Sequence, residues 1–409
     1  MSFRTTLRLS AGTALAAALC ALSPSLAADP LEAALDDFFA SIEEAVPGKF
    51  SLNSRTRYER FATPAVDRRG FSQRFRYGYA TPDFEGFGAY IEGETLFALN
   101  GSHRIHPLDQ AGSGTELNQL RLHYADPALG RITLGRQIYT LDDQRFIGHV
   151  GWRQNIQTFD ALTAAFTGVE NLAVNAFYLD RVKRVDGSGQ DLTGLGLNLR
   201  YTVAPSLAVT AFAYRLDFDR MAAWSNDTIG LRLTGRTAAS DLTLAYALSY
   251  ARQTDNSGSG PRDFSLDYWA GDLAATFHGV TLGAGFEFLE GDGTEGFRTP
   301  LATVHAFNGH ADKFLPVAGF PLGLDDRYLY ASYRLPVGAG IPLRVAHHWF
   351  RPEQGPGRYG RELNFTGSYA FNKYFSLVAK YGRYRPDSHA VGIGQGKKSM
   401  FTLELNFNY

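Results

Sequence analysis

Arginines spaced two residues apart recur along this 409-residue chain, and their side chains could bind anions. The chain has 33 arginines but only 7 lysines. A guanidinium is a planar fork that holds a carboxylate or a phosphate through two parallel hydrogen bonds. Arg55, Arg57 and Glu59 are spaced in this way in one stretch, and Arg74 and Arg76 in the next. If these stretches are strands, each set lies on one face, where it would attract anionic solutes.

These charged positions must be carried by strands, because apolar and polar residues alternate from Phe50 onward. The final stretch is the clearest case, since Phe401, Leu403, Leu405, Phe407 and Tyr409 alternate with polar residues. This period of two is typical of β-strands with one apolar face. Alternation predicts eighteen strands, near 50–61, 69–80, 84–98, 117–125, 130–138, 158–167, 172–181, 192–202, 206–217, 227–236, 242–251, 268–277, 280–289, 324–335, 343–351, 361–370, 374–385 and 397–408.

The connections between the predicted strands alternate between short and long. The longest are 99–116, 139–157, 252–267 and 290–323. Transmembrane β-barrels combine an even strand number with short periplasmic turns and longer extracellular loops. A soluble sandwich would also show alternating strands, but it would not explain this regular alternation of connection lengths. We therefore predict an all-β, antiparallel transmembrane barrel of about eighteen strands over residues 49–409.

The residues before the barrel are predicted to form two further segments. Residues 1–27 carry Arg4 and Arg8, then an apolar stretch over 11–22 and small residues before a cleavage point after Ala27, which is typical of an export signal. Residues 28–48 show helical periodicity and end at a Pro-Gly pair, which predicts a short amphipathic helix and linker. The helix could lie at the periplasmic end of the barrel, or act as a plug or protein contact.

If the apolar face meets lipid, the opposite face lines the lumen and is mostly basic. Eleven of its charged residues are basic and six acidic. Mutual pairing would stabilise the wall without selecting a solute, and this alternative stays open for each residue. The excess of cations nevertheless predicts an anion-leaning pore. The residues are Arg55, Arg57, Arg74, Arg76, Arg121, Arg131, Arg200, Arg232, Arg334, Arg344 and Lys380, with Glu59, Glu92, Glu94, Glu287, Glu362 and Glu404.

The connection 139–157 is too apolar for a solvated loop and mixes carboxylates with arginines. We expect it to fold inward and narrow the lumen, placing Arg145 and Arg153 opposite Asp142 and Asp143. A packed extracellular cap is the alternative. The connection 290–323 could narrow the lumen in the same way.

Two runs of the sequence resemble the alginate-export family of outer-membrane porins. One comprises Gly135-Arg136-Gln137 with the charged and aromatic residues up to Asp160, and the other covers His305 to Phe314 with Gly323 to Tyr328. The resemblance implies a monomeric eighteen-stranded barrel with an Arg-rich constriction that passes an anionic polysaccharide or another acidic solute. It places Arg136, Asp142, Arg145 and Arg153 at the constriction. Strict alternation, however, puts Arg136 on the face of Ile132 and Leu134.

The sequence thus predicts a passive channel in the outer membrane of a Gram-negative bacterium rather than an enzyme. His305, His310, His347 and His348 could serve a barrel lipase or protease, but the chain has no Gly-x-Ser-x-Gly elbow. His347 and His348 adjoin Trp349, which favours a place in an interfacial girdle over a catalytic role. A non-conducting adhesin or structural barrel is the other alternative.

Few partners are expected. A pI near 6.8 gives no support for nucleic-acid binding, and no cofactor or metal site is predicted. The expected partners are the anionic solute, outer-membrane lipid and lipopolysaccharide, and the barrel assembly machinery through the strand that ends at Tyr409. The candidate residues for the constriction and for solute binding are Arg136, Asp142, Arg145, Arg153, Arg55, Arg57, Arg74, Arg76, Arg121 and Arg334.

Overall fold

The computed structural model describes residues 30–102, 104–106, 113–256 and 263–409. The predicted signal peptide, residues 1–27, lies outside this part of the chain. Eighteen strands were predicted, and eighteen are present. Their bounds are β1 Lys49–Ala62, β2 Asp67–Ala80, β3 Phe87–Asn100, β4 Gly114–Asp126, β5 Gly130–Gln137, β6 Thr158–Val169, β7 Leu172–Lys183, β8 Gly189–Ala204, β9 Leu207–Phe218, β10 Asn226–Ala239, β11 Leu242–Thr254, β12 Ser265–Phe277, β13 Val280–Leu289, β14 Leu324–Leu335, β15 Ile341–Arg351, β16 Gly360–Ala370, β17 Phe375–Pro386 and β18 Lys398–Asn408.

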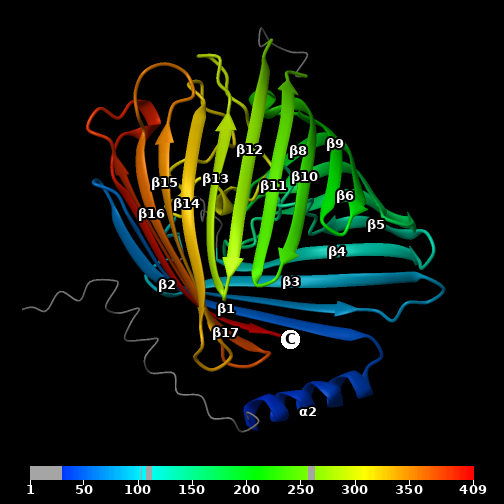
Figure 1. Cartoon of the computed structure of the whole chain (residues 1–409). Helices are drawn as coiled ribbons and strands as arrows, with labels where there is room; N and C mark the ends of the chain where they lie inside the picture. Colours follow the sequence, from blue (N-terminus) through cyan, green and yellow to red (C-terminus); the bar gives the residue numbers. More distant parts are fainter. Residues whose placement is uncertain (1–29, 103, 107–112, 257–262) are drawn as a thin grey trace, which may run out of the picture.

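The strands form one closed antiparallel sheet. Each strand pairs with its neighbours in sequence, and β1 closes the barrel against β18, from Asn53 opposite Asn408 to Ala62 opposite Ser399. Closure leaves no strand edge whose backbone groups would lie unpaired in lipid. Figure 1 shows the C-terminus at the end of the barrel with the short turns, while the long connections lie at the opposite end. We refer to these as the periplasmic and the extracellular end.

The outer surface of the wall is apolar, as the alternation predicted. Ile229 is 64% exposed, and Leu122 and Leu282 are 61% exposed, on strands in which the next residue points inward. Apolar side chains exposed on this scale would be costly in water, but they fit the hydrocarbon of a bilayer. No helix in the described ranges is long and apolar enough to span a bilayer.

The third strand begins three residues later than predicted. Alternation placed the start of the third strand at residue 84, but β3 begins at Phe87. Glu85 and Gly86 adopt φ angles of 50° and 86°, and the backbones of Phe84 and Phe87 bond to each other across them. Positive φ angles at two successive residues build a tight turn. The apolar Phe84 therefore belongs to a turn rather than to the strand.

The only α-helix in the described ranges, α2 (Pro30–Ala45), packs on the outside of the barrel at the periplasmic end. The ring of Phe39 stacks on Tyr409 with centroids 3.5 Å apart and also contacts Phe407. Asp36 forms an ion pair with Lys373 at 2.7 Å. Phe407 and Tyr409 belong to the outward-facing set of β18, so α2 is a surface helix at the periplasmic end and not a plug.

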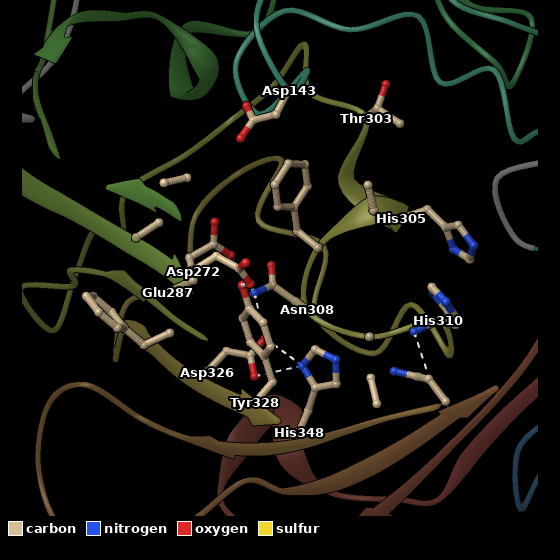
Figure 2. Close-up of a pocket in the computed structure, with 18 of the residues that line it drawn as sticks. Asp143, Asp272, Glu287, Thr303, His305, Asn308, His310, Asp326, Tyr328 and His348 are labelled. Carbon is tan, nitrogen blue, oxygen red and sulfur yellow. Dashed lines mark hydrogen bonds and ion pairs between the residues drawn. The ribbon is translucent and has the colours of Figure 1, made fainter. Parts of the chain in front are cut away.

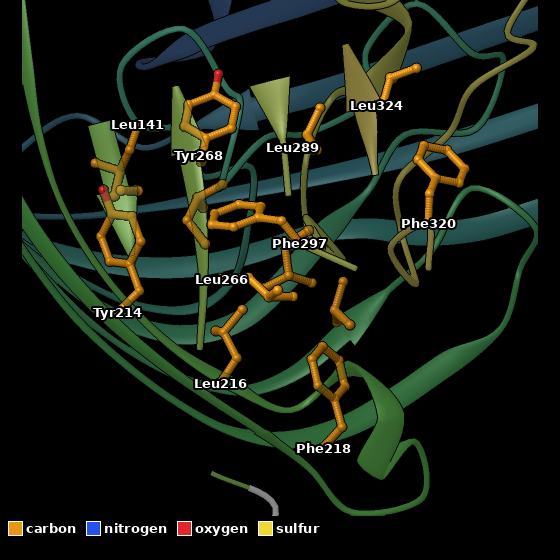
Figure 3. Packing of buried hydrophobic residues seen from close by; sticks show 14 of the residues in the cluster. Leu141, Tyr214, Leu216, Phe218, Leu266, Tyr268, Leu289, Phe297, Phe320 and Leu324 are labelled. Atoms are coloured by element: carbon orange, nitrogen blue, oxygen red, sulfur yellow. The ribbon is translucent and has the colours of Figure 1, made fainter. Parts of the chain in front are cut away.

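An apolar cluster lies inside the barrel, in the half nearer the extracellular end. Figure 3 shows Tyr214 and Leu216 of β9, and Leu266 and Tyr268 of β12, packed around Phe297 of the connection 290–323. The inner face of the wall is therefore not polar throughout. Both faces of these strands are apolar because the inner face packs on inward-folded connections. The connections also hold three short 3₁₀ helices, η1 Ala222–Trp224, η2 Val304–Ala306 and η3 Gly392–Gly394.

Candidate pore constriction

The connection 139–157 folds inward, as predicted, and binds the inner face of β1. The expectation that Arg145 and Arg153 lie opposite Asp142 and Asp143 was wrong, because both arginines pair with glutamates of the wall instead. Arg153 is fully buried and donates two hydrogen bonds to Glu59, at 3.1 and 3.2 Å. Arg55 donates to the backbone carbonyls of Gly151, Trp152 and Arg153 at 3.1 to 3.3 Å. The guanidinium of Arg55 therefore satisfies carbonyl groups that would otherwise lie buried without a donor.

The neighbouring arginines of β1 and β2 hold the same segment. Arg57 is fully buried, donates to Glu404 at 2.8 Å and also binds the carbonyl of Trp152. Arg74 is also fully buried and donates to the carbonyl of Gln154 at 3.4 Å. Arg76 lies half-buried on the same inward face of β2. Three of the four strand arginines thus bind the connection itself rather than face open lumen.

The same connection is held on the opposite wall through Arg145. Its guanidinium contacts both carboxylate oxygens of Glu287 on β13, at 2.7 and 3.0 Å, and lies over the ring of Phe307. Asn308 donates to Glu287 at 2.6 Å. A buried charge is tolerated only when it is paired and hydrogen-bonded, and Arg145 and Glu287 meet both conditions. The connection 139–157 therefore has ionic anchors on both sides of the lumen.

The connection 290–323 also folds inward and packs on the first one. Ile147 and Leu301 form a parallel bridge, and the ring of His305 stacks on Trp152 with centroids 3.5 Å apart. Asp312 accepts a hydrogen bond from His305 at 2.8 Å. Burial lowers the pKa of His305 well below its ordinary value, and the nearby cations Lys380, Arg153 and Arg57 lower it further. The two connections thus form one packed constriction around neutral His305.

A cavity of about 500 Å³ remains between this constriction and the wall formed by β10 to β17. Figure 2 shows acidic side chains on one side of it and His305 and His310 on the other. Asp272 accepts hydrogen bonds from the hydroxyls of Tyr328 and Tyr330 at 3.0 and 2.9 Å. Asp272, Tyr328 and Tyr330 were not among the predicted site residues. Only their shared inward parity on β12 and β14 could have indicated them.

Among the charged residues predicted for the inner wall, the exposed ones are basic. All six carboxylates predicted for the inner wall are buried, and the most exposed of them, Glu92, reaches only 8%. By contrast, Arg131, Arg200, Arg334 and Arg344 are all exposed. Most of the carboxylates are engaged with arginines, amides or backbone groups, whereas several cations face the aqueous lumen. The accessible members of this predicted set are therefore mostly basic, which favours anions.

The remaining candidates lie apart from the cluster on β1 and β2. Asp142 is exposed and accepts a hydrogen bond from Asn198 at 2.7 Å. Arg121 faces inward over the ring of Tyr90, at 4.9 Å from its centroid. Arg334 lies at the periplasmic end of β14 and donates to the carbonyl of Ala339. These residues line the same lumen but do not share one site.

The placement of Arg136 in the constriction was wrong. Its guanidinium forms two hydrogen bonds with Asp160, at 2.7 and 2.8 Å, and both side chains are 30% exposed. Arg136 shares the outward face of Ile132 and Leu134, as alternation required, while the next residue, Gln137, is buried on the inner side. The strand does not bulge at this point, so the matched arginine belongs to the outer surface.

The suggestion that His347 and His348 both belong to an interfacial girdle is only half right. His347 faces outward and its ring lies 4.4 Å from that of Trp349. His348 faces inward and pairs with Asp326 at 2.9 Å, because successive residues of a strand point to opposite faces. Among the described residues, no group of three or more histidine, cysteine, aspartate or glutamate side chains is arranged to hold a metal ion.

Comparison with known proteins finds similarity in structure but not in sequence. No protein-family model matches the chain, and no curated protein does. Crystal structures of Pseudomonas aeruginosa OccK9 (OpdG) and Acinetobacter baumannii OccAB2 superpose with TM-scores of 0.71 and 0.70, at 14% and 15% identity. P. aeruginosa OpdK, solved with vanillate, superposes with a TM-score of 0.69 at 13% identity. Each comparison covers 88% of this chain and 98% of the other.

The fold is that of an eighteen-stranded outer-membrane barrel. OpdK is described as an outer membrane protein, and this chain spans nearly its whole length. The comparisons thus support the broader part of the resemblance drawn from the sequence, an outer-membrane porin barrel of eighteen strands. They give no specific support for the alginate-export family.

Proposed function

We propose that the protein is a passive channel of the Gram-negative outer membrane that passes small anionic solutes. The observation that carries this proposal is the difference in accessibility of charge inside the barrel. The predicted wall carboxylates are buried, whereas arginines such as Arg131, Arg200 and Arg344 are exposed to the lumen. Exposed cations raise the local concentration of anions and repel cations, but they release a solute readily because water competes for them.

The size of the free space favours small carboxylates over polymers. Two connections cross the lumen, anchored through Arg153 and Arg145, and leave a cavity of about 500 Å³. OpdK was crystallised with vanillate, an aromatic carboxylate, and a solute of this class would find Arg344, Lys380 and Tyr328 around the cavity. We therefore propose monocarboxylates of this size as the solute class.

The finer alternative, from the resemblance to the alginate-export family, is passage of an acidic polysaccharide. It would require the two connections to move aside, breaking the buried pairs of Arg153 with Glu59 and Arg145 with Glu287. Small solutes need no such movement, which is why we prefer them.

Reversal-potential measurement in planar bilayers tests the function. With a tenfold gradient of potassium chloride across the bilayer, an anion-selective lumen shifts the reversal potential towards the equilibrium potential of chloride. A cation preference overturns the proposal. A barrel enzyme or a structural barrel that does not conduct would show no current above background.

Liposome swelling then tests the solute class. Vanillate should enter faster than vanillyl alcohol, which has nearly the same size but no charge, and faster than an oligouronate. Equal rates for vanillate and the alcohol would remove the role of the arginines, and faster entry of the oligouronate would favour the polysaccharide alternative.

A channel of this kind would be exported and assembled in the outer membrane. Residues 1–27 would be removed on export, and the last strand, with Tyr409 at its end, would be recognised by the barrel assembly machinery. Closure of the sheet within one chain supports a channel that works as a monomer.

A further inference from the structure

Arginines also lie on the outer face of the barrel, in a band at the extracellular end. In most of this band each arginine is bound to an aspartate on the adjacent strand. Arg60 pairs with Asp67, Arg136 with Asp160, Arg215 with Asp227 and Arg252 with Asp267, at shortest distances of 2.7, 2.7, 2.6 and 3.7 Å. These pairs leave little net charge on the band.

The outer face of β14 to β17 departs from this pattern. Its arginines lie next to one another across four strands, because Arg327 is opposite Trp349, Trp349 is opposite Arg361 and Arg361 is opposite Arg385. We refer to the six arginines of this region as the outer arginine patch: Arg327, Arg351, Arg358, Arg361, Arg383 and Arg385.

Only two aspartates compensate the outer arginine patch. Asp325 binds both Arg327 and Arg351, and Asp387 lies 3.9 Å from Arg358. In the described part of the chain, Arg361, Arg383 and Arg385 form no ion pair with a carboxylate. Arg361 and Arg385 are moreover directly opposite each other on neighbouring strands. Like charges in this arrangement repel each other, so a bound anion would stabilise the wall.

The outer arginine patch lines a groove that continues into the lipid-facing surface. The groove has a volume of about 770 Å³ and is lined by five of the six arginines together with Leu329, Trp349 and Ser388. Leu329 is 54% exposed on the outward face below the arginines, and Trp349 is 45% exposed and lies between Arg327 and Arg361 at their level. An apolar surface thus begins among the arginines and continues below them. Tryptophan is typical of this level, where hydrocarbon meets headgroups.

The geometry points to a binding site for lipopolysaccharide, held through the phosphate groups at its acylated end. Guanidinium forks at Arg361 and Arg385 would bind phosphate oxygens in pairs. Acyl chains would lie on Leu329 and Trp349. Two features favour this ligand: its anionic phosphates match the uncompensated arginines, and the groove is continuous with the surface that already contacts lipid. The site faces away from the lumen and is independent of the transported solute.

Native mass spectrometry of the detergent-solubilised full-length barrel with bisphosphorylated lipid A tests this site. The double variant Arg361→Gln with Arg385→Gln removes the two opposed forks. The matched control, Arg215→Gln, removes an arginine of the same band that is already paired with Asp227. We expect lipid A to bind about tenfold more weakly to the double variant, since it loses hydrogen bonds between charged groups, and with unchanged affinity to the control.

Two further binding measurements distinguish lipid A from free phosphate as the ligand. Monophosphorylated lipid A should bind more weakly than the bisphosphorylated form, and inorganic phosphate at millimolar concentration should not displace either. Displacement by inorganic phosphate alone, or equal lipid A binding by wild type and the double variant, overturns the proposal. Resistance of the folded barrel to SDS before heating verifies that the variants fold. Ion selectivity of the double variant should equal that of wild type, so the channel function is tested separately.

Discussion

Arginines on the two sides of the barrel wall occupy different environments. Inside, Arg57, Arg145 and Arg153 are at most 1% exposed, and each binds a glutamate. Outside, on β16 and β17, Arg361 and Arg385 are exposed and have no carboxylate partner in the described part of the chain. The difference follows from solvation. A charge buried without a partner costs several kcal/mol, whereas a charge at the surface costs little and remains free to bind an external anion.

Arginine thus has two different roles in this barrel. The buried inner arginines hold the connections 139–157 and 290–323 in place and so shape the path. The exposed arginines, inside the lumen or on the outer face, are available to ligands. The following substitutions test this division, beginning with the largest effect.

Removal of a buried inner arginine should release the constriction. Arg153→Ala leaves Glu59 buried without its bidentate partner, which disfavours the docked connection by about 3–5 kcal/mol. We expect a larger and noisier single-channel conductance, measured in planar bilayers. The double variant Glu59→Leu with Arg153→Met removes both charges and should restore much of the wild-type current. Unchanged conductance in Arg153→Ala would mean that this pair does not hold the connection.

Removal of accessible cations should alter selectivity without altering the path. In Arg344→Gln with Lys380→Gln, the anion-to-cation permeability ratio should fall about fourfold per charge, because a unit charge about 10 Å from an ion in water changes the occupancy of the anion and of the cation about twofold in opposite directions. The reversal potential measures this ratio. Single-channel conductance at high salt should stay near that of wild type, because neither residue forms an ion pair with a described carboxylate. A ratio equal to wild type would place both residues away from the ion path.

Acidification should loosen the constriction through its buried histidines. The pKa of His305 is lowered, so the docked connections bind fewer protons than the released ones and lose stability as the pH falls below about 6.5. Burial lowers the pKa of His310 in the same direction. We expect more frequent current fluctuations at pH 5 than at pH 7.5. In His305→Phe, which can keep the ring stacked on Trp152, this dependence should weaken; an unaltered pH response would assign the effect to other groups.

The smallest effect is expected at Arg136. The variant Arg136→Gln breaks a partly exposed pair with Asp160 on the outer face, which contributes only ~0.2–1 kcal/mol. Thermal unfolding should change little, and ion selectivity should be indistinguishable from that of wild type. A clear loss of anion selectivity would return this residue to the lumen and contradict the outward placement.

Local pattern predicted most of the wall. Alternation and connection length gave the strand number and the inward parity of residues such as Arg57 and Arg74, because a strand's two faces are fixed by backbone geometry. The inward path of 139–157 was also predicted, from its apolar character. The loss of Phe84 from β3 was not, because apolar character alone does not reveal a tight turn.

Contacts across the lumen could not be predicted from the sequence. Arg145 meets Glu287, which lies 142 residues further along the chain, only because the barrel closes and two connections fold into it. The apolar cluster around Phe297 was missed for the same reason, since its partners on β9 and β12 are brought together by the fold. Arg136 shows the opposite case, in which alternation was correct and the motif match misled.

The contact between α2 and the last strand has a consequence for the order of assembly. Phe39 lies close to the N-terminus of the described chain, yet its stacking partner is Tyr409, the final residue. The helix leaves the ribosome before any strand, but its docking surface, formed by Lys373, Tyr374, Phe407 and Tyr409, exists only once the end of β18 has been laid beside the start of β17. An undocked α2 would therefore mark a chain whose last strand is not yet in place, and protease cleavage between the helix and β1 would report this stage of insertion.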